Sequence, residues 1–308
     1  MLRLVTILLP LALCACTSTN RPVPVALRGA AAPSPVAVQS DTAAPPTASP
    51  EGDPAAETDA PPPPGTPSDR SLFLTVGPGA APQFEGASSY QLIPFTVVRF
   101  RDGGFAFESE GLEGRFDLVP PSWNTGWGFG PSFAFRLPRR DTGDATIDAL
   151  DSVGTAFEVG GFARYIAKPG WLGQDSWETR MTVTGDTTGA HNGVVAQLDS
   201  DYAWFPKRNI RLSFGLRASW ASNQFMNTYF QVTPEGAARS GLAPYDPEPG
   251  LRNVGAQASI LFLFNPNHGV FALVRYDQLV DEVANSPIVR DVGSAEQWLV
   301  GAGYSYRF

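Results

Sequence analysis

Residues 211–220 read RLSFGLRASW, and this stretch decides the fold class. Successive side chains of a β-strand point to opposite faces, so every second residue shares a face. One face of the segment is apolar, and the other carries arginine, serine and glycine. The apolar face consists of Leu212, Phe214, Leu216, Ala218 and Trp220. The segment therefore predicts a strand between apolar and polar surroundings, and a shift of one residue would exchange its two faces.

The same period-two pattern recurs from about residue 71 to the C-terminus, in segments of about ten residues separated by Gly, Asn, Asp and Pro. We expect about twelve strands, within a range of about ten to fourteen. They are predicted near 71–79, 89–101, 103–109, 112–118, 127–137, 153–166, 175–185, 193–205, 210–222, 252–264, 269–280 and 295–307.

Aromatic residues and connection lengths favour a membrane barrel over a soluble periplasmic sandwich, which would also alternate. Aromatics gather near strand ends, and the last strand alternates up to Phe308, which resembles the C-terminal assembly signature of bacterial outer-membrane barrels. Short connections at 101–103, 206–209 and 265–268 are predicted periplasmic turns. Long ones at 138–152, 223–251 and 281–294 are predicted external loops, whereas 119–126 and 167–174 are rather long for turns. The sequence therefore predicts an all-β, antiparallel, up-and-down transmembrane β-barrel over residues 71–308 in the outer membrane.

The N-terminal 70 residues have a different composition. Residues 1–15 combine one arginine, a short apolar core and small residues, which predicts a signal peptide. Residues 13–16, LCAC, resemble a bacterial lipobox, although Cys14 stands where the lipobox usually has Ala, Ser or Thr. Two alternatives follow: lipidation of Cys16, or ordinary signal-peptidase cleavage nearby. Residues 16–70 are rich in Pro and Ala and cannot bury a core, so we expect a disordered linker in the periplasm.

Several kinds of chemistry are not expected. The net charge of −8 argues against a nucleic-acid partner, and both cysteines lie at the end of the signal segment. His191 and His268 fall on opposite sides of the predicted membrane, so they cannot form one metal site. Asp199 and Asp201 share a face as an acid protease would require, but such carboxylates are more often solvated or paired with arginine. We therefore predict no enzyme activity and no catalytic, cofactor or metal site.

The inward face of the predicted barrel carries many charges, and two interpretations follow. A closed barrel would use ion pairs to fill its interior, whereas a narrow channel would leave water among them and pass small charged solutes. Twelve strands lie between filled and open barrels, so geometry alone does not choose, and we favour the narrow or plugged form. The predicted lumen charges are Glu158, Arg164, Glu178, Arg180, Asp199, Asp201, Arg211 and Arg217, joined by Arg275 and Arg307.

The loop 223–251 is a further candidate because it is long and mixes aromatics with turn residues. Within it, residues 234–239 predict a short helical turn with Pro234 at its first position and Gly241 as its stop. The loop could be a lid or a contact surface for a partner, or it could simply fold over the mouth of the barrel.

Several segments resemble the MipA/OmpV family of outer-membrane proteins. They are TYFQVTPEGAARSGLAPY at 228–245, SPIV at 286–289, GAGYSYRF at 301–308, VGPG at 76–79, FEG at 84–86 and GFGPS at 128–132. The resemblance implies an outer-membrane barrel in contact with outer-membrane lipid. The best-known member is described as a scaffold linking a lytic murein transglycosylase to a murein synthase, and others as immunogenic surface proteins or adhesins. The resemblance therefore implies periplasmic partners from murein synthesis and no catalytic residues.

Overall fold

The computed structural model describes residues 70–119 and 126–308. The predictions of a signal peptide over 1–15, lipidation at Cys16 and a linker over 16–70 fall outside the described residues. The strands are β1 Ser71–Pro82, β2 Tyr90–Asp102, β3 Phe105–Glu110, β4 Glu113–Asp117, β5 Trp127–Arg136, β6 Ala156–Ala167, β7 Asp175–Asp186, β8 Val194–Lys207, β9 Ile210–Ala221, β10 Gly250–Leu263, β11 His268–Leu279 and β12 Glu296–Arg307. The helices are α1 Ala145–Asp148, α2 Asn223–Phe230, α3 Pro234–Ser240 and α4 Asp281–Asn285, followed by a π-helical segment at Ile288–Val292.

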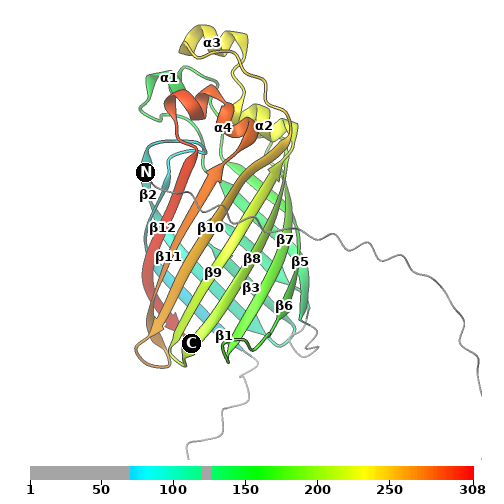
Figure 1. Ribbon diagram of the computed structural model, residues 1–308, viewed down its shortest axis with the longest axis vertical. Coiled ribbons are helices and arrows are strands. Elements are labelled where there is room, and N and C mark those ends of the chain that lie inside the picture. Colours follow the sequence, from blue (N-terminus) through cyan, green and yellow to red (C-terminus); the bar gives the residue numbers. More distant parts are fainter. Residues whose placement is uncertain (1–69, 120–125) are drawn as a thin grey trace, which may run out of the picture. The chain divides into compact units, whose positions relative to one another are not determined.

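The strands form one closed antiparallel barrel in which each pairs with its neighbours in sequence (Figure 1). The barrel closes between β1 and β12, where Phe73 lies opposite Arg307 and Ala80 opposite Val300. Closure leaves no free sheet edge, which excludes the soluble sandwich and confirms the predicted up-and-down barrel. The twelve predicted strands lie close to the observed ones. The largest difference is at β6, which begins after Val153 because that residue instead pairs with Arg139 in an isolated bridge.

The apolar and polar faces predicted for residues 211–220 are the outer and inner faces of the barrel wall. On β9, Phe214 and Leu216 face outward and are 56% and 69% exposed, whereas Arg217 and Ser219 face inward and are 7% and 2% exposed. Large apolar side chains are exposed in the same way on the outside of most other strands. Such a continuous apolar exterior is stable in contact with lipid and not with water, so the barrel is a transmembrane barrel.

The two ends of the barrel differ, and we name them by their connections. The turn end holds residues 103–104, 168–174, 208–209 and 264–267 together with Phe308; the loop end holds residues 83–89, 137–155, 187–193, 222–249 and 280–295. All the helices gather at the loop end (Figure 1). None of these helices is long and apolar enough to cross a membrane.

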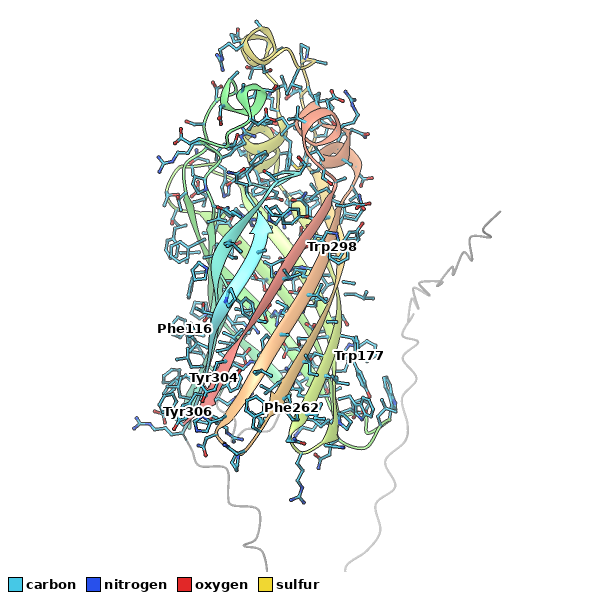
Figure 2. The ribbon with its side chains drawn as sticks, turned by 90° about the vertical axis from the view of Figure 1, so that its left-hand side faces the viewer. Phe116, Trp177, Phe262, Trp298, Tyr304 and Tyr306 are labelled. Atoms are coloured by element: carbon cyan, nitrogen blue, oxygen red, sulfur yellow. The ribbon has the colours of Figure 1, made fainter. Side chains whose placement is uncertain are left out.

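Aromatic side chains mark both ends of the apolar exterior (Figure 2). Towards the turn end, Trp177 meets Trp171 edge-on at 5.6 Å between ring centroids, and Tyr304 and Tyr306 follow on β12. Towards the loop end, Trp298 packs on Tyr276 at 4.7 Å. Aromatic rings favour the boundary between lipid tails and water, so these two groups indicate where the membrane surfaces meet the barrel.

One side of the barrel interior is apolar, which the sequence analysis did not predict. Phe95 and Val97 of β2 pack inside against Phe271 and Leu273 of β11, and the rings of Phe95 and Phe271 stack at 6.0 Å. The remaining inner wall, from β3 to β9 and on β10 and β11, carries charged and polar groups. The lumen is therefore packed by hydrophobic contact on one side and by polar contacts on the other.

Candidate functional site

A chain of alternating charges runs around the inner wall. It begins at Asp117 of β4, which accepts a 2.9 Å hydrogen bond from Nε of Arg164 on β6. Arg164 also contacts Glu178 of β7 at 3.4 Å, and Glu178 accepts from Arg180 at 2.6 Å. Arg180 continues to Asp199 of β8 at 3.1 Å. Each charge thus lies between opposite charges, which offsets the cost of removing it from water.

The chain continues on β9 and β11 through Arg217. Its Nε lies 3.7 Å from a carboxylate oxygen of Asp199 and 3.7 Å from one of Asp277. Glycines on the intervening strands make room for the chain. A Cβ at Gly128 of β5 would lie 2.3 Å from Asp117, and one at Gly255 of β10 would lie 2.3 Å from Asp277.

The structure places the eight sequence-predicted lumen residues in four different settings. Arg164, Glu178, Arg180, Asp199 and Arg217 belong to the charge chain. Asp201 accepts a 2.7 Å hydrogen bond from the side-chain amide of Gln257, so it forms no acid pair with Asp199. Arg211 lines the lumen without an ion pair in the described parts of the chain, and Glu158 lies at the loop end.

The sequence analysis did not identify Asp117 and Asp277 as members of the charge chain. It also missed two further ion pairs, Glu108 with Arg115 at 2.6 Å and Glu110 with Arg275 at 2.7 Å. All of these carboxylates occupy inward positions of their strands. The period-two pattern could therefore have identified them as lumen residues, but their pairing depends on strand tilt and stagger, which no single strand shows.

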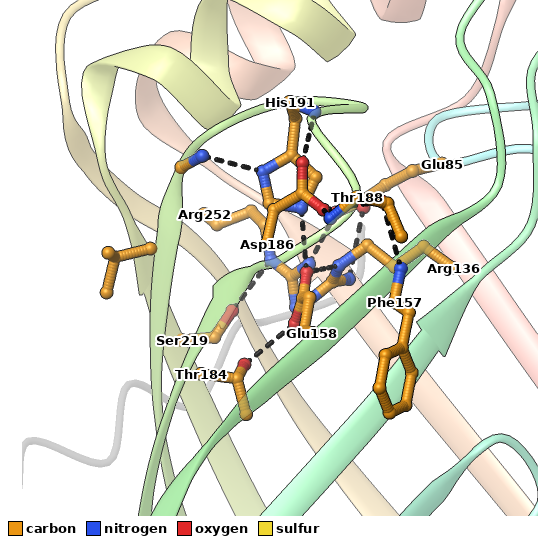
Figure 3. A network of polar contacts seen from close by, with 12 residues as sticks. Glu85, Arg136, Phe157, Glu158, Thr184, Asp186, Thr188, His191, Ser219 and Arg252 are labelled. Atoms are coloured by element: carbon orange, nitrogen blue, oxygen red, sulfur yellow. Dashed lines mark hydrogen bonds and ion pairs between the residues drawn. The ribbon is translucent and has the colours of Figure 1, made fainter.

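Glu158 is the centre of a buried network at the loop end (Figure 3). Its side chain is fully buried and contacts the Arg136 guanidinium, which is 19% exposed. It also accepts a 2.7 Å hydrogen bond from the hydroxyl of Thr184 and lies 3.0 Å from Nε2 of His191. Arg136 in turn lies 3.7 Å from Glu85, which binds Arg252 at 2.8 Å. The network thereby joins β5, β6, β7 and β10 to the β1–β2 loop.

His191 is held in one tautomer by its two contacts. The main-chain N–H of Gly193 donates to Nδ1 at 3.0 Å, so the ring proton resides on Nε2 and donates to Glu158. Asp186 fixes the same loop by accepting from the main-chain N–H groups of His191 and Asn192, at 2.7 and 2.9 Å. His191 is therefore a structural residue of the loop end, and His268 lies at the other end as the first residue of β11.

Helix α2 fills the loop end above this network. Two guanidinium groups contact the ring of Phe225, with Arg136 4.9 Å and Arg252 5.5 Å from its centroid. Phe225, Met226, Tyr229 and Phe230 are almost completely buried. The chain from 223 to 230 thus folds over the mouth of the barrel and inserts its aromatic side chains, one of the two roles considered for the loop.

Arg139 connects α2 to the loop between β5 and β6. It is 4% exposed and donates to the main-chain oxygens of Tyr229 at 2.6 Å and Asp151 at 3.1 Å. Burial lowers the pKa of Arg139 to about 10, so the guanidinium remains protonated at neutral pH. Burial also raises the pKa of Tyr229 well above its ordinary value, because a phenolate there would lose its hydration.

Helix α3 extends beyond α2 at the loop end (Figure 1). As predicted, Pro234 starts the helix and Gly241 ends it in the left-handed region, with φ of 80°. The side chain of Thr233 caps it by accepting from the N–H of Gly236 at 3.0 Å. Arg239 ties α3 to the β5–β6 loop through a 2.6 Å contact with Asp151. Helix α3 is therefore largely exposed, whereas the neighbouring helix α2 is packed into the mouth of the barrel.

The lumen holds two cavities, one beside the charge chain and one towards the turn end. A chamber of about 270 Å³ lies within the barrel, and a wider mouth of about 890 Å³ lies towards the turn end. Arg101, Arg164 and Phe205 line both cavities, so the chamber and the mouth adjoin. Within residues 70–119 and 126–308, no group of three or more His, Cys, Asp or Glu side chains could hold a metal ion.

Comparison with known proteins identifies relatives with similar sequences. The family described as MltA-interacting protein MipA matches residues 74–308. The MltA-interacting proteins of Escherichia coli strain K12 and Shigella flexneri are each 27% identical over 224 residues, covering 70% of this chain and 81% of theirs. Among solved structures, OmpT, an outer membrane protein of Vibrio cholerae, is 8% identical with a TM-score of 0.28, over 79% of this chain and 99% of that one.

Salmonella typhi OmpF in complex with daunomycin is 12% identical with a TM-score of 0.27, over 77% of this chain and 97% of that one. At such scores the two solved barrels add nothing to the assignment. The family match, in contrast, extends from the first strand to the last residue of the barrel. The chain therefore belongs to the MltA-interacting protein MipA family.

Proposed function

We propose that this protein is a non-enzymatic outer-membrane scaffold that binds a lytic murein transglycosylase, and through it the murein-synthesis machinery, on the periplasmic side. The observation that carries the proposal is the 27% identity over 224 residues to relatives named MltA-interacting protein. The match covers 81% of those relatives, so a shared binding surface would lie within the aligned barrel.

The barrel architecture supports an orientation in which the turn end faces the periplasm. Outer-membrane barrels have short periplasmic turns and long external loops, and the C-terminal Phe308 lies at the turn end. Residues 16–70 would then form a periplasmic linker before β1, with Cys16 available for a lipid anchor. The transglycosylase would meet the barrel at the turn end.

The β6–β7 connection is the best candidate for that contact. Trp171 is 66% exposed and Leu172 is 55% exposed, and Lys168 beside them is also exposed. Asp175 holds the connection in shape by accepting from the N–H groups of Gly170 at 2.7 Å and Leu172 at 3.0 Å. Trp171 packs on Trp177 at the membrane boundary, so we expect its exposed face, with Lys168 beside it, to meet a partner that binds at the periplasmic membrane surface. The loop is already fixed, so little entropy is lost when the partner covers it.

The contact can be tested by surface plasmon resonance with the full chain in detergent and the lytic transglycosylase of the same organism. We expect saturable binding that weakens at least about tenfold in a Trp171→Ser/Lys168→Ser variant. Arg140→Ser, an exposed charge change at the loop end, should bind as the wild type does. Absence of binding by the wild type would refute the scaffold, and equal binding by all three proteins would refute the assigned surface.

The alternative of a narrow channel for small charged solutes has less support. Helix α2 inserts Phe225 and Phe230 into the loop end, and the charge chain neutralises most of the lumen arginines. A solute would have to displace both. The absence of enzyme activity remains part of the proposal. Of the two carboxylates considered for catalysis, Asp199 pairs with Arg180 and Arg217, and Asp201 accepts from Gln257.

A further inference from the structure

Three lumen arginines differ from the others. Arg115, Arg164, Arg180, Arg217 and Arg275 each have a carboxylate partner within 4.0 Å. Three other arginines line the chamber: Arg99, Arg101 and Arg211. Within the described parts of the chain, none of the three has an ion pair within 4.0 Å or a hydrogen bond to a side chain. Their charges therefore face the cavity without a carboxylate in direct contact, although Glu108, Glu178 and Asp201 act on them from farther away.

These three arginines lie at the part of the chamber nearest the turn end. Arg101 is the penultimate residue of β2, Arg99 precedes it on the same face, and Arg211 is the second residue of β9. Strands β2 and β9 are nearly opposite in the ring of twelve, so the guanidinium groups face each other across the lumen. Arg99 repels Arg211 electrostatically, and Glu108, Glu178 and Asp201 oppose that repulsion in part.

A neighbouring hydroxyl provides a second, independent feature of the site. Ser213 follows Arg211 on the inward face of β9, is 9% exposed and lines the same chamber. Its buried Oγ has no hydrogen-bond partner among the described residues. Buried hydroxyls are nearly always hydrogen-bonded, so this hydroxyl is available to donate to an oxygen of a ligand in the chamber.

The charge balance of the chamber indicates the sign of that ligand. Eight arginines and six carboxylates line the chamber, and Asp117 and Asp277 pair with two of these arginines from beside it, so the excess of positive charge is local to Arg99, Arg101 and Arg211 near the turn end. Burying like charges together is unfavourable unless a counter-ion is present. Guanidinium groups bind phosphate and carboxylate oxygens with two parallel hydrogen bonds, and a serine hydroxyl donates a third.

We propose that the lower lumen is a binding site for a compact multivalent oxyanion, bearing phosphate or carboxylate groups, held by Arg99, Arg211 and Ser213 with Arg101 at the entrance. The ligand enters through the mouth of about 890 Å³, because Arg101 and Phe205 line both that mouth and the chamber. The closed loop end leaves the turn end as the route of access. The site goes beyond the scaffold role and does not depend on it.

The test is isothermal titration calorimetry of the full chain in detergent at low salt, with pyrophosphate as one probe and citrate as the other. We expect one site per chain for at least one probe, and the tighter probe identifies phosphate or carboxylate as the natural group. An Arg99→Gln/Arg211→Gln variant should bind at least about tenfold more weakly, since each charge-assisted pair contributes about that factor. Ser213→Ala should weaken binding by a smaller factor.

Arg140→Gln is the matched control, because it removes the same charge from an exposed position at the loop end. Thermal unfolding of each variant without probe checks folding, and the double variant should unfold no earlier than the wild type because like-charge repulsion has been removed. Should it misfold, Arg211→Lys keeps the charge, loses the two-point contact and should still weaken binding. Absence of saturable binding, or equal loss in Arg140→Gln, would overturn the site.

Discussion

Replacing Glu158 with Gln tests how far the buried network stabilises the barrel. The substitution keeps the size of the side chain and its acceptor oxygen for His191, but removes the charge opposite Arg136. Breaking one side of a buried ion pair costs about 3–5 kcal/mol. Arg136 keeps Glu85 at 3.7 Å and the ring of Phe225 at 4.9 Å, so we expect the lower end of that range, about 3 kcal/mol.

The assay is urea unfolding of the refolded barrel in lipid vesicles, followed by tryptophan fluorescence. Arg239→Gln is the control, because its ion pair with Asp151 is 48% and 79% exposed and should contribute less than about 1 kcal/mol. Glu158→Ala should cost more than Glu158→Gln, because it also removes the acceptor for Thr184 and His191. A Glu158→Gln barrel within about 1 kcal/mol of the wild type would refute the reasoning, since the pair would then contribute no more than a surface pair.

Three further predictions follow from the structure. Gly128→Ala would bring a Cβ within 2.3 Å of the charge chain and should destabilise the barrel by about 1–3 kcal/mol in urea, whereas Gly104→Ala, with nothing within 4 Å, should be neutral. Phe225→Ala should cost about 3–5 kcal/mol in the same assay and expose the loop 223–251 to chymotrypsin; unchanged cleavage would contradict the packing of α2. The N–H and hydroxyl of Thr142 hold the pKa of Asp148 below its ordinary value of 3.8. This contact therefore stabilises the loop above pH 3.8, and the stabilisation is lost as pH falls through the lower pKa of the folded state. Pepsin cleavage at 142–148 should rise at the acid end of the pH range in which pepsin is active, and not near pH 5.

Much of the barrel wall could be predicted because one physical rule governs it. Each strand places one face in lipid, so alternation appears in every segment, as in residues 211–220, and the short and long connections mark the two ends. The inward positions of Glu158 and Arg217 followed from the same rule. Strand β2 obeys it less clearly, because Phe95 and Val97 face inward and are apolar like its outer residues. The apolar side of the lumen was therefore not recognised.

The pairing of charges could not be predicted, because it depends on how the closed barrel staggers distant strands. Asp277 lies close to Arg217 only because β9, β10 and β11 pair in the observed register, with Gly255 leaving room between them. For the same reason, the sequence could not show that Arg211 has no carboxylate within 4.0 Å among the described residues. The sequence also marked 223–251 as a long aromatic loop, but the contacts of Phe225 with two arginines depend on barrel closure, which brings Arg136 of β5 and Arg252 of β10 near one ring.

The central claim is that a closed barrel serves as a scaffold and does not conduct. Single-channel recording of the full chain in planar bilayers tests it most directly. The account predicts no conductance steps for the wild type, and steps once residues 223–230 are replaced by a Gly/Ser linker. Discrete steps from the wild type that change with Arg180→Gln or Arg217→Gln would contradict the account and establish a narrow channel.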